Sequence, residues 1–150
     1  MTERTGRYPA RLIVALIGIA YLALGLAGFW TPQASTAGPD PSRTVWIFGS
    51  SAVLNVVHTA VGVLALLAAL HRTSTIAFAW VLFFGFTGLT VNGVLVAATG
   101  TSGNPVNLNW ADNWLHGLTA LAGLAIVLYD IGASRRGVSR RGGAHAAARR

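Results

Sequence analysis

Long apolar runs separated by short polar segments dominate this chain of 150 residues. The first run has 19 residues without a charged side chain, close to the ~20 that cross the hydrocarbon core of a membrane. Four such runs are present: residues 12–30, 51–70, 76–98 and 113–131. Asp112 immediately precedes the fourth run and is expected to cap its helix. The pattern predicts an all-α fold, a polytopic membrane four-helix bundle over residues 12–131.

The first run has a second interpretation as a secretory signal peptide, with residues 33–37 as a cleavage region of small side chains. The apolar segments of signal peptides usually have about 7–15 residues, fewer than this run contains. We therefore expect residues 12–30 to be retained as the first membrane helix.

Composition supports a membrane location for the same reason. Apolar residues make up 53% of the chain and charged residues only 10%, whereas soluble domains carry about 25% charge. A chain this short has too little interior to bury so much apolar surface. It has no cysteine, which excludes disulfides, thiolate metal ligands and thiol nucleophiles.

Arginine supplies all eleven basic side chains, and most of them lie near the two ends. Residues 1–11 hold three, the turn at Arg72 one and residues 134–150 six, whereas the other two predicted loops together hold only Arg43. Because positive loops face the cytoplasm, we expect a multi-pass protein of the plasma membrane with both termini cytoplasmic. Residues 1–11 then form a cytoplasmic N-terminal segment.

Residues 134–150 are expected to be a disordered, basic cytoplasmic tail. Its arginines should contact anionic lipid head groups rather than nucleic acid. They are Arg135, Arg136, Arg140, Arg141, Arg149 and Arg150. Asp130 lies just before the tail, and we expect it to form an interfacial ion pair beside Arg135 and Arg136.

A polar motif occurs twice, as Asn55-Val-Val-His58 and again, at the start of the fourth run, as Asn113-Trp-Leu-His116. Residues three apart share a helix face, and polar side chains in membrane helices usually face inward and mark functional sites. The duplication predicts two repeated helical hairpins around a polar core formed by these four residues and Asp112. The spacings Gly25-x-x-Gly28 and Gly85-x-x-Gly88 support the repeat weakly.

Three segments resemble a known family: Leu22–Phe29, Asn55–Gly62 and Ala111–His116. The resemblance is to domain of unknown function 4383 (DUF4383), small four-helix membrane proteins found mostly in actinobacteria. It covers about residues 12–131 and leaves out both basic ends. The family has no assigned activity, so the resemblance implies a fold and a location but no mechanism.

The polar core allows several interpretations. The simplest is interhelical hydrogen bonding, at about 0.6 kcal/mol per bond, in a protein with a structural or interaction role. His58 and His116 are also candidate axial ligands of haem b, or, together with Asp112, ligands of a metal ion. Because histidine titrates near neutral pH, an oligomer could instead pass protons or small solutes.

Motifs typical of enzymes are missing from the sequence. It has no phosphate-binding glycine loop, no Gly-x-Ser-x-Gly nucleophile elbow, and four acidic residues in all. We therefore expect no catalytic residue and no resident cofactor. The expected partners are the lipid bilayer and either further copies of the chain or another membrane protein.

Overall fold

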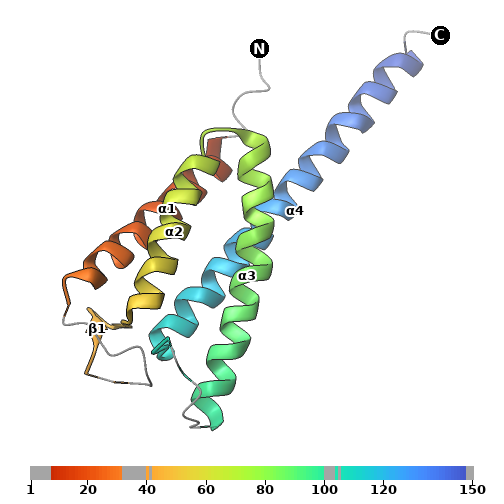
Figure 1. Ribbon diagram of the computed structural model, residues 1–150. Coiled ribbons are helices and arrows are strands. Elements are labelled where there is room, and N and C mark those ends of the chain that lie inside the picture. Colours follow the sequence, from red (N-terminus) through yellow and green to blue (C-terminus); the bar gives the residue numbers. More distant parts are fainter. Residues whose placement is uncertain (1–7, 32–39, 41, 100–103, 105, 148–150) are drawn as a thin grey trace.

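Two antiparallel helical hairpins make up most of the chain. The computed structural model describes residues 8–31, 40, 42–99, 104 and 106–147. These residues form α1 (Tyr8–Phe29), β1 (Thr44–Val45), β2 (Phe48–Gly49), α2 (Ala52–Ala68), α3 (Arg72–Thr99) and α4 (Trp110–Ala147). Helices α1 and α2 lie side by side as the first hairpin, and α3 and α4 as the second (Figure 1).

Three of the described helices are long and apolar enough to cross a membrane. They cover Pro9–Phe29, Arg72–Thr99 and Trp110–Arg136, whereas α2 is apolar but shorter. Successive helices alternate in direction, so α2 runs parallel to α4 (Figure 1). The predicted fold class, a membrane helical bundle of two hairpins, is confirmed.

Helix α4 begins three residues before its predicted start. The Asn109 side-chain Oδ1 accepts a hydrogen bond from the amide of Asp112 at 3.1 Å, and Asp112 Oδ2 accepts one from the amide of Asn109 at 2.8 Å. This reciprocal pair is a capping box. Asn109 is therefore the N-cap, and Asp112, predicted as the cap, is the third residue of the helix.

Helix α4 also continues to Ala147, far beyond the bundle (Figure 1). The sequence predicts a disordered tail from residue 134, and the structure differs from that prediction over residues 134–147. Alanine and arginine have high helix propensities, and extending an existing helix avoids the cost of nucleation. Residues 148–150 lie outside the described part of the chain.

Glycines bring α1 and α2 into backbone contact. A Cβ atom on Gly62 would lie 2.5 Å from the backbone nitrogen of Leu22, and one on Gly25 would lie 2.3 Å from Thr59 Oγ1. Real Cβ atoms essentially never approach so closely. The first hairpin can therefore form only because these positions lack a side chain.

The second hairpin uses different glycines. Gly123 packs tightly, because a Cβ there would lie 2.6 Å from the carbonyl oxygen of Ala79. Around Gly85 and Gly88, no described atom lies within 4 Å of an added Cβ. The recurrence of Gly25-x-x-Gly28 as Gly85-x-x-Gly88 is therefore not a repeated contact.

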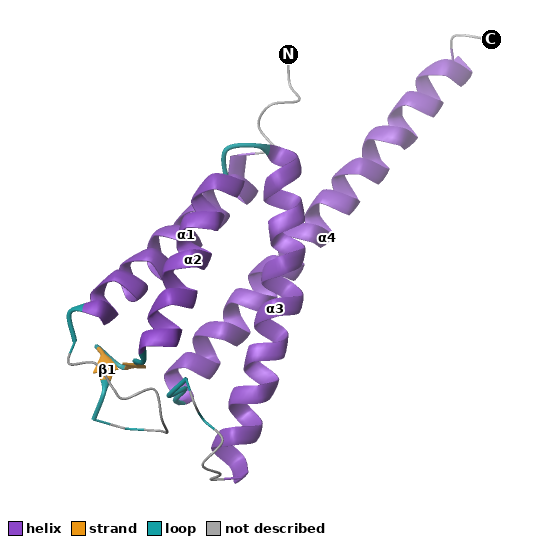
Figure 2. Cartoon of the chain, viewed as in Figure 1, coloured by secondary structure: helices purple, strands orange, loops and turns teal. Residues whose placement is uncertain are grey.

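One end of the bundle carries β1, β2 and residues 106–109 before α4, together called the polar cap (Figure 2). Asn107 organises this cap: its Nδ2 donates to the carbonyl oxygen of Ser50 at 3.1 Å, and its Oδ1 accepts from the amide of Asp40 at 2.8 Å. Asp112 Oδ2 accepts from the amide of Gly49 at 2.9 Å. These bonds fix the cap to the start of α4.

The opposite half of the bundle is apolar. A buried layer there consists of Val14, Ala65, Ala69, Ala79, Ile126 and Val127. Beyond it, Arg11 donates from Nε to the carbonyl oxygen of Ala69 and from Nη2 to that of Leu70, both at 2.7 Å. Arg11 thereby satisfies carbonyl groups at the C-terminal end of α2.

Candidate functional site

The two Asn-x-x-His pairs occupy equivalent positions at the starts of α2 and α4. Helix α2 begins after the N-cap Ser51, whose Oγ accepts a hydrogen bond from the amide of Leu54 at 3.1 Å. The caps Ser51 and Asn109 are separated by the same distance along the sequence as the two pairs. All four side chains of the pairs are buried: Asn55, His58, Asn113 and His116. The repeat therefore includes the signal that starts each helix.

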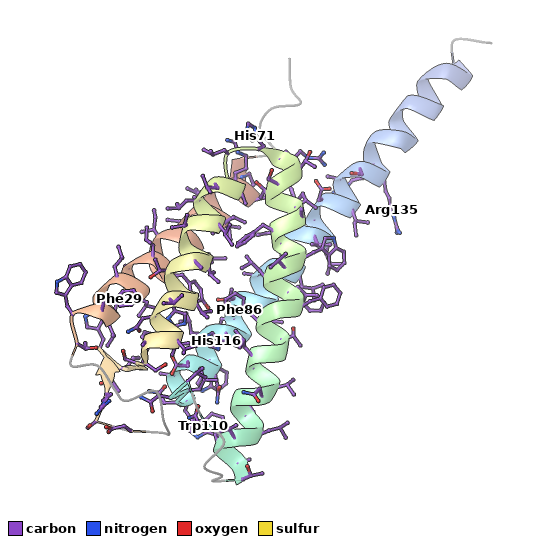
Figure 3. The ribbon with its side chains drawn as sticks, in the orientation of Figure 1. Phe29, His71, Phe86, Trp110, His116 and Arg135 are labelled. Carbon is purple, nitrogen blue, oxygen red and sulfur yellow. The ribbon has the colours of Figure 1, made fainter. Side chains whose placement is uncertain are left out.

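The two histidines meet between the hairpins in a closed cluster of four rings. The ring centroids of His58 and His116 are 5.8 Å apart. Tyr21 of α1 lies 5.2 Å from His58, Phe86 of α3 lies 5.3 Å from His116, and Tyr21 and Phe86 lie 5.1 Å from each other. Figure 3 shows Phe86 and His116 in the interior. Each hairpin contributes one aromatic ring and one imidazole.

Nearer the polar cap, each asparagine lies against a glycine of its own hairpin. A Cβ on Gly28 would lie 2.1 Å from Asn55 Oδ1, and a Cβ on Gly93 would lie 1.9 Å from Asn113 Oδ1. The sequence offset from Gly28 to Gly93 is the same as the offset from Tyr21 to Phe86. Any larger side chain at either glycine would displace the amide.

Several buried atoms of this core have no hydrogen-bond partner among the described residues, and they are called open atoms below. They include Nε2 of His58, Nδ1 and Nε2 of His116, Nδ2 of Asn55, and both amide atoms of Asn113. A buried polar group without a partner costs about 1–3 kcal/mol, and a membrane interior offers no water to relieve that cost. The described chain does not fully satisfy its own polar core.

Tyr21 makes the interhelical hydrogen bond that the histidines do not. Its hydroxyl lies 3.0 Å from Thr119 Oγ1 of α4. Because the Thr119 hydroxyl donates to the carbonyl oxygen of Leu115 at 2.8 Å, Tyr21 is the donor. Sequence reasoning missed Tyr21, Phe86 and Thr119. Tyr21 and Phe86 are separated along the sequence by the same offset as Gly28 and Gly93, and this shared offset could have identified them.

Asp112 belongs to the polar cap and the capping box rather than to the histidine pair. Among the described residues, no group of three or more His, Cys, Asp or Glu side chains could hold a metal ion. The predicted ligands His58, His116 and Asp112 therefore do not form a three-ligand group.

A haem held by both imidazoles would have to fit beside two other rings. A porphyrin ligated on both faces lies between its axial ligands and extends well beyond them. Tyr21 contacts His58, Phe86 contacts His116, and these two rings contact each other beside the histidines. Haem ligation would require these two rings to separate.

The basic residues predicted at the membrane surface are only partly described. Arg135 is exposed on α4 beyond the bundle (Figure 3), and the next residue, Arg136, is exposed as well. The side chains of Arg140 and Arg141, and all of Arg149 and Arg150, lie outside the described residues. Asp130 pairs with Arg72 at the start of α3, a partner that the sequence interpretation did not name.

The fold and its core define a small membrane protein of two helical hairpins joined through a polar centre. Residues 11–129 match the family described as Domain of unknown function (DUF4383), and the chain belongs to that family. The predicted family is thus confirmed. No curated protein and no solved structure matches the chain.

Proposed function

We propose that the protein is a non-catalytic, multi-pass plasma-membrane protein with an interaction role: it binds a small, uncharged guest molecule at the polar core between its hairpins. The observation that carries this proposal is the set of open atoms. A core that served packing alone would avoid the cost of unpaired polar groups.

His116 argues most strongly for a guest. Its side chain is fully buried, yet both ring nitrogens are open atoms. A neutral imidazole offers one donor and one acceptor, so a guest that carries a hydroxyl or a carbonyl can pair with it. The nearby bond between Tyr21 and Thr119 is the kind of contact expected if the chain satisfied the core by itself.

The apolar layer favours binding over passage through a single bundle. Val14 lies seven residues from Tyr21 on α1, and Ala65 lies seven residues from His58 on α2. Seven residues of helix correspond to about 10 Å. Beyond the histidines, a guest or a proton would meet a packed apolar barrier.

Two features support cytoplasmic termini. The start of α1, the turn between α2 and α3, and the second half of α4 lie toward one end of the molecule (Figure 1), together with most of the arginines. The polar-cap end carries tryptophans that are more than half exposed, namely Trp30, Trp46, Trp110 and Trp114. Arginine on the cytoplasmic side and tryptophan at the interface are typical of membrane proteins.

Native mass spectrometry of the protein released from nanodiscs tests the proposal. We expect the wild type to retain a bound molecule that His116→Leu loses and His116→Gln, which keeps a donor and an acceptor, partly retains. His71→Leu is the matched control, because His71 is exposed in the turn before α3. A wild type without any guest, or equal retention by His116→Leu, would contradict the proposal.

Cofactor binding is the second candidate function, favoured by the contact between two imidazoles with open nitrogens. Absorption spectra of oxidised and dithionite-reduced protein test for haem, and elemental analysis tests for a metal ion. A Soret band or a metal stoichiometry that is lost in His58→Ala but kept in His71→Ala would support it. Equal metal content in both variants, with no Soret band, would reject it.

A further inference from the structure

The second hairpin carries a surface groove. It lies between α3 and α4 in the half nearer the polar cap and has a volume of about 390 Å³, within the range of small-molecule sites. Its lining includes Phe83, Val91, Trp110, Asn113 and Trp114. Val91, Trp110 and Trp114 are each more than half exposed, so the groove opens on the outer surface of two membrane helices.

The groove is lined by one buried side chain whose donor and acceptor atoms are both open, Asn113. Thr87 and Thr90 also line it, but their hydroxyls donate to carbonyl oxygens of their own helix, at 2.6 and 2.7 Å. Asn113 is only 4% exposed, and both its amide atoms are open. It therefore presents an unused donor and an unused acceptor at the buried side of an apolar groove.

The charge of the lining restricts the occupant further. No described residue that lines the groove is charged, and an ionic head group held there would have no counter-charge to offset its desolvation. Trp110 and Trp114 lie within one turn of each other at the start of α4, and tryptophan in membrane proteins concentrates at head-group depth. An occupant can therefore keep its head near the interface and its apolar body along the helices.

We infer that this groove binds a neutral amphiphile from the bilayer, with its hydrocarbon body against α3 and α4 and a hydroxyl or carbonyl head hydrogen-bonded to Asn113. The inference rests on the proposed function and specifies it, because Asn113 lies three residues before His116 on the same face of α4. The head of such a lipid would therefore enter the edge of the polar core from the membrane side.

A comparison of the binding of two lipids with the same acyl chains tests the inference. Dioleoylglycerol is the neutral probe and dioleoylphosphatidylglycerol the anionic one, each added to the full-length protein in detergent and counted as bound adducts by native mass spectrometry. We expect the wild type to prefer dioleoylglycerol. Asn113→Ala should weaken that binding about tenfold, the effect of losing one buried hydrogen-bonding group.

Two further variants separate loss of the site from loss of the fold. Val91→Trp fills the groove from its exposed wall and should abolish dioleoylglycerol binding while the helical circular dichroism is kept. Leu64→Trp, on the exposed face of α2, and Asn92→Ala, exposed on α3 outside the groove, are matched controls. Both controls should bind like the wild type.

The outcomes distinguish this inference from the proposed function. Unchanged dioleoylglycerol binding in Asn113→Ala and Val91→Trp, or equal binding of the anionic lipid, would overturn the inference. If dioleoylglycerol does not bind but the wild type still carries a guest that His116→Leu loses, the groove assignment fails and the proposed function stands. Binding that depends on Asn113, Val91 and His116 together would support both.

Discussion

The two hairpins share one plan but differ in how far each is closed. In both hairpins, an asparagine packs on a glycine and an imidazole contacts an aromatic ring. Equivalent residues of α1 and α3 are separated by one constant sequence offset, and equivalent residues of α2 and α4 by another. In the first hairpin, an added Cβ on Gly25 would lie 2.3 Å from Thr59 Oγ1. At the equivalent level of the second, the nearest described atom to a Cβ on Gly117 is Thr90 Cγ2, at 3.7 Å.

A glycine and a threonine occupy opposite helices in the two hairpins, and the spacing between the paired helices differs as well. Gly25 and Thr59 correspond by the two offsets to Thr90 and Gly117. The first pair leaves no room between α1 and α2, whereas the second pair lines the groove between α3 and α4. The two pairs contain the same residue types, and they differ only in which helix carries the glycine.

The asparagines diverge in the same direction. Asn55 Oδ1 accepts a hydrogen bond from Ser50 Oγ at 3.3 Å. The residue that precedes Asn113 by the same spacing is Leu108, which has no side-chain donor. Both amide atoms of Asn113 are left open among the described residues. The first hairpin therefore pairs one amide atom of its asparagine, and the second hairpin pairs neither.

The largest predicted difference between the hairpins comes from adding one methyl group. Gly62→Ala forces a Cβ against the backbone of Leu22, and we expect it to destabilise the protein by about 3 kcal/mol, the upper part of the usual range for overpacking. Gly88→Ala, whose Cβ meets open space, should be neutral or stabilise by up to ~1 kcal/mol.

Unfolding in mixed micelles with increasing sodium dodecyl sulfate, followed by circular dichroism, measures both changes. Equal losses in Gly62→Ala and Gly88→Ala would show that the tight contact between α1 and α2 does not control stability.

The aromatic positions Tyr21 and Phe86 give the next largest effect on stability. The two positions are equivalent, but only Tyr21 faces a hydroxyl that can accept its hydrogen bond. Phe86→Tyr should destabilise the protein by about 2 kcal/mol, the cost of a buried hydroxyl without a partner. The residue equivalent to Thr119 on α2 is Val61, which cannot accept its hydrogen bond. The same unfolding assay measures this loss, and Phe86→Tyr/Val61→Thr should recover part of it. No rescue by the second change would argue against the equivalence of the two hairpins.

The reverse substitution should cost less. Tyr21→Phe removes the hydrogen bond from Tyr21 to Thr119 Oγ1 but leaves no new donor unpaired, so we expect a loss of about 1 kcal/mol. Thr119→Val should cost more, about 2 kcal/mol, because it leaves the buried Tyr21 hydroxyl without an acceptor, and the double variant should cost less than the sum of the two single variants. Additive losses would mean that the two hydroxyls contribute independently.

The sequence predicts the membrane helices and the two polar motifs because both depend on local properties. The length of an apolar run reports what can cross a bilayer, and a spacing of three residues assigns Asn55 and His58 to one helix face. The repeat is visible for the same reason, since a fixed offset relates whole motifs along the chain.

Contacts between helices were less predictable. The glycine beneath Asn113 is Gly93, not one of the pair Gly85 and Gly88, because the choice depends on where α3 crosses α4. The groove likewise depends on the spacing of two helices. The basic composition predicts disorder after residue 133, whereas α4 continues as a helix to Ala147, in keeping with the high helix propensity of alanine and arginine.

The smallest effect is expected at the end of the bundle away from the polar cap, where each hairpin uses an arginine differently. Arg11 donates to two backbone carbonyls of α2, whereas Arg72 pairs with Asp130, and their side chains are 45% and 24% exposed. Exposed ion pairs contribute about 0.2–1 kcal/mol, so Arg72→Ala should cost about 0.5 kcal/mol at low salt and less at about 1 M salt, where charges are screened within ~3 Å.

A double-mutant cycle of Arg72→Ala and Asp130→Ala, measured by the same unfolding assay at both salt concentrations, isolates the pair. Coupling that is lost at high salt would mean that this end of the second hairpin is held mainly by apolar packing. Strong coupling that survives at high salt would contradict the exposed position of the pair and would make it a structural clamp that the first hairpin replaces with Arg11.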